Sequence, residues 1–493
     1  MPASHDSLSG GRDEPFKTVV RRLSLGSEIG TISLRSNAYP ATDIRATVAF
    51  PSAGPTPGPE SMPAPKHPKQ SQPRRDFLRH TVVGTSLICS LAQGWQQLLG
   101  WAKPAPARFD LVIKGGKVVD PSQQLSAPRD VGIRDGKIAE VTEIAETEAR
   151  QVLDARGKIV TPGLIDVHVH VYDGVAPLGI PADPNCIAKG VTTVVDAGSS
   201  GAHTFPGFRR QVINVVDTRV FALLNISVVG QSTLSQDNPY GELLDLRYAN
   251  PKLAIRTIEQ NRDVVLGVKV RLSRSIAGDH DLEALKLAKE AAEAVRLPLM
   301  VHIGETHTPL PTILSLLAKG DVVTHSFRGG EGGILDDKGR VLNEVRGAVA
   351  RGVHLDIGHG AGSFSFDTAE RALKQDVVPG TISSDVHQFN VNGPVFDLAT
   401  TLSKFLHLGL TLEQVIERAS TNAANLFAFP KGLGTLRPGA EADVAVFSLL
   451  EGDFEFVDAL QQRRLGHQKL SPVATVKAGR IYGSAPLPVA RLG

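Results

Sequence analysis

The sequence is poor in cysteine. Its 493 residues include only two cysteines, Cys89 and Cys186. Two thiols cannot build a disulfide framework, and they cannot supply a zinc site made of thiolates. We therefore expect the metal ligands of this chain to be nitrogen and oxygen atoms.

An excess of charge is also missing. The chain has 53 basic and 51 acidic residues, a formal charge of +2, and only 5% aromatic residues. We find no basic patch interleaved with aromatic side chains, so a nucleic-acid-binding surface is not expected and the expected partner is a small-molecule substrate. The length and the 41% hydrophobic content suit one large barrel with a smaller attachment.

The N-terminal part of the chain has a composition that cannot bury much apolar surface. Residues 1–72 are rich in Pro, Ser, Gly and Arg, and we expect them to be a disordered extension. Residues 73–107 resemble a twin-arginine export signal. The features that carry this resemblance are Arg74-Arg75, Phe77-Leu78, a weakly apolar stretch over 81–92, and the small residues Ala105-Pro106-Ala107.

The position of this signal has consequences for the start and the location of the protein. Because an export signal normally lies near the first residue, we expect Met62 to be the true start and residues 1–61 not to be made. We expect export to the periplasm by the twin-arginine machinery, without a stable membrane anchor, because the apolar stretch is too short and polar to span a bilayer. The alternative is a chance arginine pair before a buried helix.

The middle of the chain alternates strand-length apolar runs with helical stretches such as 282–295. Eight such units predict a (β/α)8 TIM-type barrel, of α/β class, over 161–429. Short strands with turn residues in 108–160 and 430–485 predict one small β-sandwich-like domain built from both terminal segments. The expected barrel strands are 163–170, 191–197, 220–227, 265–272, 298–304, 321–326, 353–358 and 380–385.

Two histidines one residue apart stand at the end of the first barrel strand. Side chains two apart on a strand share a face, so His168 and His170 can bind one metal ion together. A lone pair of this kind is more often structural. Here, however, later strands end near four further candidate residues, as active-site residues do in such barrels: Lys269, His302, His325 and Asp385.

This series of residues resembles the amidohydrolase superfamily of metal-dependent hydrolases. The resemblance covers about residues 109–483 and includes Thr161-Pro-Gly-Leu-Ile-Asp-Val-His-Val-His170. Further motifs resemble the deacetylase-type branch, close to the dihydroorotases: Val195-Asp-Ala-Gly-Ser199, Gly267-Val-Lys-Val-Arg271, Asp356-Ile-Gly-His-Gly360 and Ser383-Ser-Asp-Val-His387.

The resemblance implies a site with two divalent metal ions. It implies that His168, His170 and Asp385 hold one ion, and that His302 and His325 hold a second, more open one. It also implies that Lys269 is N6-carboxylated and bridges the two ions. Ligands without thiolate suit Zn2+, with manganese, iron, cobalt or nickel as alternatives. Asp385 is the expected catalytic residue, accepting a proton from the attacking water.

The resemblance further implies hydrolysis of amide or ester bonds, and we expect a deacetylase or deacylase acting on a small carboxylate-bearing substrate. The alternative is a cyclic amide hydrolase like a dihydroorotase or hydantoinase, and deamination is less favoured. A barrel without metal that serves as a binding module is the alternative from another class. His359, His387 and Arg271 are candidate substrate contacts, and a homo-oligomer is possible, as large barrels often assemble symmetrically.

Overall fold

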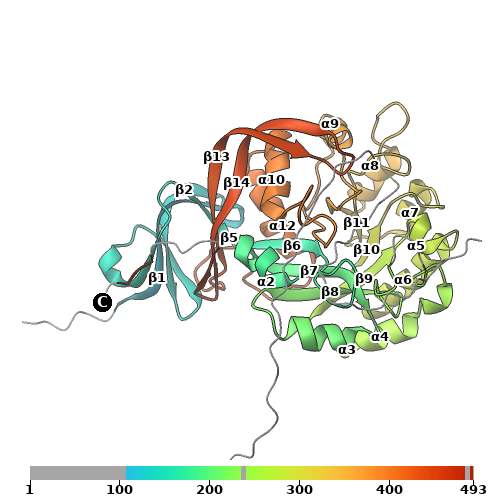
Figure 1. The fold of residues 1–493 in the computed structure, drawn as a ribbon, viewed down its shortest axis with the longest axis horizontal. Coiled ribbons are helices and arrows are strands. Elements are labelled where there is room, and N and C mark those ends of the chain that lie inside the picture. Colours follow the sequence, from blue (N-terminus) through green and yellow to red (C-terminus); the bar gives the residue numbers. More distant parts are fainter. Residues whose placement is uncertain (1–106, 235–239, 484–488, 492–493) are drawn as a thin grey trace, which may run out of the picture. The chain divides into compact units, whose positions relative to one another are not determined.

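A computed structural model describes residues 107–234, 240–483 and 489–491 (Figure 1). The expected disordered extension, the expected start at Met62 and the expected export signal lie outside the described residues, apart from the last residue of the signal. Within the described ranges, no helix is long and apolar enough to cross a membrane.

A curled parallel sheet forms the larger part of the fold. Its seven strands are hydrogen-bonded in chain order, and every neighbouring pair is parallel. They are β6 (Leu164–Val169), β7 (Val191–Gly201), β8 (Arg219–Asn225), β9 (Val265–Arg271), β10 (Leu299–His302), β11 (Val322–Thr324) and β12 (His354–Leu355). These strands coincide with the first seven that the apolar runs predict.

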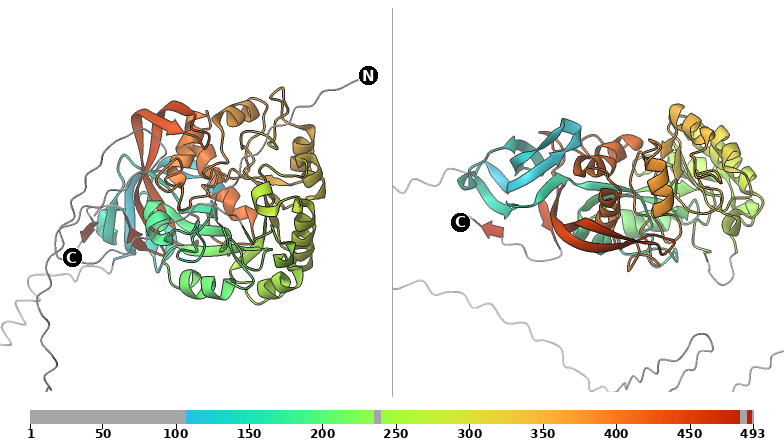
Figure 2. Two further views of the ribbon diagram at one scale, coloured as in Figure 1. Left: turned by 45° about the vertical axis from the view of Figure 1, so that its right-hand side comes forward. Right: turned by 90° about the horizontal axis from the view of Figure 1, so that it is seen from above.

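Most of the helices lie around the outside of this sheet, as Figure 1 and the left view of Figure 2 show, whereas α12 packs in a separate buried cluster with side chains of the strands such as Val167 and Met300. The predicted helix over 282–295 is α6 (Asp281–Val295), whose buried residues recur at helical spacing against the strands. The others are α2 (Ala182–Asn185), α3 (Phe205–Phe208), α4 (Pro251–Glu259), α5 (Arg274–Ala277), α7 (Leu310–Leu316), α8 (Asn343–Ala350), α9 (Phe366–Leu373), α10 (Leu398–His407), α11 (Leu412–Arg418) and α12 (Thr421–Leu426).

The eighth predicted strand, 380–385, is not a regular strand. Single parallel bridges connect this segment to both edges of the sheet, pairing Thr381 with Asp356 on one side and Val386 with Val169 on the other. Regular pairing fails because Asp385 has a left-handed backbone, with φ of 49°, which an extended strand cannot contain. The segment nevertheless lies between the first and last strands.

The two ends of the chain share one mixed sheet of nine strands. The hydrogen-bonded order is β15-β14-β13-β5-β1-β2-β3, with β4 between β1 and β16. Both terminal segments thus contribute, but the named strands form a single sheet and not the two sheets of a sandwich. The strands are β1 (Phe109–Asp120), β2 (Leu125–Arg134), β3 (Lys137–Thr142), β4 (Ala149–Asp154), β5 (Ile159–Pro162), β13 (Val444–Val457), β14 (Arg463–Lys477), β15 (Arg480–Tyr482) and β16 (Val489–Arg491).

Strand β13 is buried on both faces at its start. Val444 and Val446 belong to a cluster with the terminal strands, whereas Ala445 and Phe447 belong to the large cluster that includes the helices and strands of the parallel sheet. Alternating side chains of one strand therefore pack into two cores. This alternation explains why the strand reads as a continuous apolar run.

We predict that Phe447→Ala destabilises the protein by about 3–5 kcal/mol, because it removes a fully buried ring from the larger core. Leu450→Ala, on the same strand at a side chain that is 41% exposed, is the control and should cost less than about 1 kcal/mol. Urea unfolding followed by circular dichroism measures both. Equal destabilisation by the two variants would contradict this packing.

Candidate metal centre

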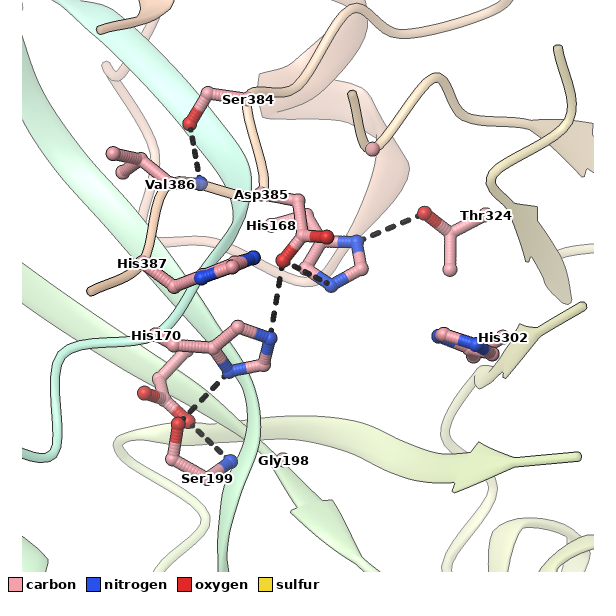
Figure 3. Close-up of polar contacts among 12 residues, drawn as sticks. His168, His170, Gly198, Ser199, His302, Thr324, Ser384, Asp385, Val386 and His387 are labelled. Carbon is pink, nitrogen blue, oxygen red and sulfur yellow. Dashed lines mark hydrogen bonds and ion pairs between the residues drawn. The ribbon is translucent and has the colours of Figure 1, made fainter. Parts of the chain in front are cut away.

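A cavity of about 230 Å³ opens at the C-terminal ends of the parallel strands. The six residues that the sequence predicts as ligands all line it, although they come from the ends of four strands, β6, β9, β10 and β11, and from the segment after β12. Figure 3 shows several of them around Asp385. The lining ligand candidates are His168, His170, Lys269, His302, His325 and Asp385.

The carboxylate of Asp385 lies at the centre of this group. Its Oδ1 is 3.1 Å from Nε2 of His170 and 3.4 Å from Nε2 of His168. Ligand atoms of His168, His325 and Asp385 all lie within 4.8 Å of one another, and all three residues are buried. Two imidazoles and a carboxylate at this separation can hold one divalent ion.

The imidazoles of this group are neutral. Burial lowers the pKa of His170 and of His325 to about 3, and it holds that of His168 well below its usual value. Nδ1 of His325 lies 2.7 Å from the carbonyl oxygen of Gly358. Because a carbonyl only accepts, this nitrogen carries the proton, and Nε2 of His325 is unprotonated.

The tautomer of a second histidine, His168, follows from a chain of hydrogen bonds behind its ring. The Thr324 hydroxyl donates to Asp356 Oδ2 at 2.7 Å, so its oxygen accepts from Nδ1 of His168 at 2.8 Å. The Nε2 atom of His168 is then unprotonated and faces Asp385. Such partners behind a histidine ligand fix its tautomer and ring orientation in metal sites.

The Oδ1 atom of Asp385 is an unsatisfied hydrogen-bond acceptor. It is buried, and no residue in the described part of the chain donates a hydrogen bond to it. Its close neighbours at His168 and His170 do not have hydrogen-bond geometry. A buried carboxylate oxygen opposite a nitrogen lone pair is unfavourable, and a cation between them removes the conflict. The residues present therefore fit a divalent metal ion.

Lys269 is a buried amine without a counter-ion. The residue is 0% exposed, and its Nζ lies 3.3 Å from Nε2 of His168 and 3.5 Å from the sulfur of Met300. It makes no ion pair with any described carboxylate. Burial lowers the pKa of Lys269 to about 7, so a neutral, nucleophilic amine is accessible near neutral pH.

His302 lies on the more open side of the group. Its Nδ1 is 2.8 Å from Nε2 of His325, and its Nε2 is 2.9 Å from the Ser273 hydroxyl. It is partly exposed, unlike His168, His170 and His325. His302 is thus the most exposed of the four candidate histidine ligands, and the assignment of His302 and His325 to a second ion stays a prediction.

Two of the candidate ligands have strained backbones. The φ angles are 66° at His325 and 49° at Asp385, each costing about 1–3 kcal/mol for such residues. Buried carboxylates hold these turns in place: Asp166 accepts from the hydroxyl and the backbone amide of Ser384. Asp356 accepts from the hydroxyls of Thr324, Thr381 and Ser383. Strain of this kind is typical of functional sites.

Two of the three predicted substrate contacts line the cavity. Arg271 is 8% exposed, and its Nη1 lies 3.3 Å from Oε2 of the buried Glu242. His387 lies beside His170, with ring centroids 6.2 Å apart, and burial lowers its pKa to about 4. Both are placed to meet a ligand, and their role in binding stays a prediction.

The structure gives His359 a different place. Its side chain is fully buried, Nδ1 contacts the carbonyl of Gly360 at 2.9 Å, and Nε2 lies 2.6 Å from Nζ of Lys404. Lys404 also donates to the carbonyls of Pro394 and Val457. With both ring nitrogens engaged, His359 does not line the cavity, and the expected substrate contact is corrected to an anchor of the loop after β12.

Other residues of the cavity have no signal in the sequence. Gln231 follows β8 and lines the wall with both polar atoms of its side chain unpartnered among the described residues. Leu178, Leu234 and Phe389 add apolar surface. A glutamine or a leucine in a loop follows no periodic pattern, so only the coordinates reveal that these residues meet at the site.

The model of the amidohydrolase family matches residues 159–482, which include every candidate ligand. The chain belongs to the amidohydrolase family. It is therefore a hydrolase that acts on carbon–nitrogen bonds, with an α/β domain of the TIM-barrel type, in a family that is typically metal-dependent.

Two relatives are named deacetylases. One, from Enterococcus faecalis, is 36% identical over 378 residues and covers 76% of this chain and 99% of its own. Another, from Brucella anthropi, is 34% identical over 382 residues, covering 77% and 89%. This agrees with the resemblance to the deacetylase-type branch of the family.

Two solved structures are also similar. One titled an adenine deaminase has a TM-score of 0.70 at 36% identity and covers 76% of this chain and 99% of its own. One titled a dihydroorotase has a TM-score of 0.68 at 32% identity, covering 75% and 98%. Neighbours at this identity thus have titles that name different reactions.

We predict that Gly198→Ala displaces Lys269. Gly198 has a φ of 87°, and an added Cβ would lie 2.7 Å from Cγ of Lys269. Metal bound per chain should fall, with about 10–100-fold less activity, because the lysine is held by its surroundings. Mass spectrometry of zinc-loaded protein measures the metal.

Gly439→Ala is the matched control for this prediction. Its φ is 86°, so the backbone strain is the same, but nothing lies within 4 Å of the added Cβ. It should retain metal and activity. A loss of metal in both variants would mean that backbone strain, and not contact with Lys269, causes the effect.

Proposed function

We propose that this protein is a dinuclear metal-dependent deacylase, removing an acyl group such as acetyl from a small carboxylate-bearing substrate. The observation that carries it is the buried, unpartnered Oδ1 of Asp385 opposite Nε2 of His168 and His170. The relatives named deacetylases support the choice of reaction.

Six residues would hold the metal ions. His168, His170 and Asp385 would hold the more buried ion, and His302 with His325 the more open one. Lys269, carboxylated on Nζ, would bridge them, as its burial and its lack of a counter-ion support. Bound divalent ions, of which zinc is the best match to these ligands, polarise a carbonyl group and lower the pKa of water.

The chain's own residues carry the proton. Asp385 accepts a proton from the attacking water through a carboxylate oxygen and gives it to the leaving nitrogen or oxygen. Glu242, which Asn225 also contacts, holds Arg271 at the cavity wall, where the guanidinium binds the substrate carboxylate. Leu178 and Phe389 exclude water from the acyl group.

A cyclic amide hydrolase is the second candidate, favoured by the similar structure titled a dihydroorotase. Zinc-loaded protein should be offered N-acyl amino acids, O-acyl hydroxy acids, cyclic ureides and aminopurines. We expect acetate release and about two ions per chain, with activity lost on chelation and restored by zinc. Ring opening would support the second candidate, whereas ammonia release or a metal-free inactive protein would contradict both.

We predict that Asp385→Asn retains metal but lowers kcat by about 10²–10⁴-fold, because an amide cannot accept the proton. Metal content and single-turnover acetate release are to be measured together. Wild-type turnover in metal-loaded Asp385→Asn would exclude Asp385 as the proton acceptor.

We also propose that residues 380–386 complete an eight-stranded barrel, since their single bridges connect to both edges of the sheet. Export through the twin-arginine pathway to the periplasm remains our proposal for the location, supported by the arginine pair at 74–75 and the residues after it. The composite terminal domain over 108–160 and 430–485 is likewise proposed from the shared sheet.

A further inference from the structure

Gln231 is a buried amide that has no side-chain hydrogen-bond partner in the described part of the chain. The residue is 0% exposed, and neither Oε1 nor Nε2 has a hydrogen-bond partner within the described ranges. Buried polar side chains are nearly always hydrogen-bonded in folded proteins. Because Gln231 lines the cavity of the candidate metal centre, a ligand in that cavity is the missing partner.

The backbone of Gln231 is firmly attached. Its amide donates to the carbonyl of Ser199 at 3.1 Å, and its carbonyl accepts from the amide of Leu234 at 3.1 Å. The Ser199 hydroxyl in turn lies 2.9 Å from Nδ1 of His170. Gln231 is thus attached through its backbone to the strand that supports the candidate ligand His170.

Arg271 contributes N–H donors without a partner among the described residues to the same cavity. Its guanidinium makes one hydrogen bond among the described residues, from Nη1 to Oε2 of Glu242 at 3.3 Å. Asn225 contacts the other oxygen of Glu242, also at 3.3 Å. The guanidinium is held from one side, and four of its five N–H groups remain for a ligand.

The two side chains together define the ligand that they fit. A guanidinium only donates, whereas a glutamine amide offers one acceptor and two donors in either orientation. The donors match the oxygens of a carboxylate. The acceptor, Oε1 of Gln231, needs an N–H group from the ligand, and an ester has none.

We propose that Gln231 and Arg271 form a recognition subsite that selects substrates with a secondary amide N–H beside a carboxylate, such as N-acyl amino acids, over the corresponding esters. The subsite rests on the proposed function, which leaves amide and ester open. Gln231 acts as a specificity-determining residue, because an ester would leave its buried acceptor unpaired.

The test compares N-acetyl amino acids with the O-acetyl hydroxy acids of the same side chain, on zinc-loaded enzyme. Gln231→Leu should lower kcat/KM for the amides by about tenfold or more and change that for the esters by less than about threefold. Its melting temperature should be equal or higher, since a similar-sized apolar residue replaces an unpaired amide. The matched control is Gln468→Leu, at an exposed glutamine on β14, which should leave kcat/KM unchanged for both the amides and the esters.

Arg271 is tested through the substrate, because removing it would leave Glu242 unpaired. Replacing the substrate carboxylate by a carboxamide should lower kcat/KM of the wild type for amides and esters alike. An equal loss on both substrate classes in Gln231→Leu, no loss, or a clear fall in its melting temperature would overturn the subsite. If the wild type hydrolyses neither class, the proposed function itself fails.

Discussion

The conflict between the Asp385 carboxylate and the nitrogen lone pair of His168 opposite it organises the site. Two buried acceptors cannot stabilise each other, and Oδ1 of Asp385 lies 3.4 Å from the unprotonated Nε2 of His168. A divalent cation turns this repulsion into coordination. The surrounding structure must hold the groups together when no ion is bound, and much of the fold near the cavity serves that purpose.

Buried carboxylates behind the cavity provide this support. Asp356 accepts hydrogen bonds from three hydroxyls in two segments, and through Thr324 it fixes the tautomer of His168. Asp166 holds the turn before Asp385 by its contacts with Ser384. These hydrogen bonds offset the strain of left-handed backbones at two candidate ligands, so catalytic geometry and local stability depend on the same buried network.

The terminal sheet supports the strand that carries the first histidines of the site. β5 pairs with β13 and runs into β6, which carries His168 and precedes His170. Gly163, between β5 and β6, donates from its amide to the carbonyl of Asp443 at 2.7 Å. Residues from both ends of the chain therefore position the first pair of histidines, although neither end contributes a residue to the cavity lining.

Local pattern in the sequence determined the parallel strands and the order of the six candidate ligands. Apolar runs have a period that survives without tertiary contacts, and His168 and His170 share a face because they are two residues apart on one strand. Seven strands and α6 lie where the pattern predicts them. The family motifs are likewise contiguous, so they could be read directly.

Contacts between distant segments decided the rest. The imidazole of His359 turns away from the cavity because Lys404, 45 residues later, lies 2.6 Å from its Nε2. Residues 380–385 depart from a regular strand because Asp385 adopts a left-handed backbone in a turn held by Asp166, 218 residues before Ser384. Gln231 meets Arg271 at one cavity because loop conformation brings them there. Such placements depend on side-chain packing and hydrogen bonding in three dimensions, which leave no periodic trace in the sequence.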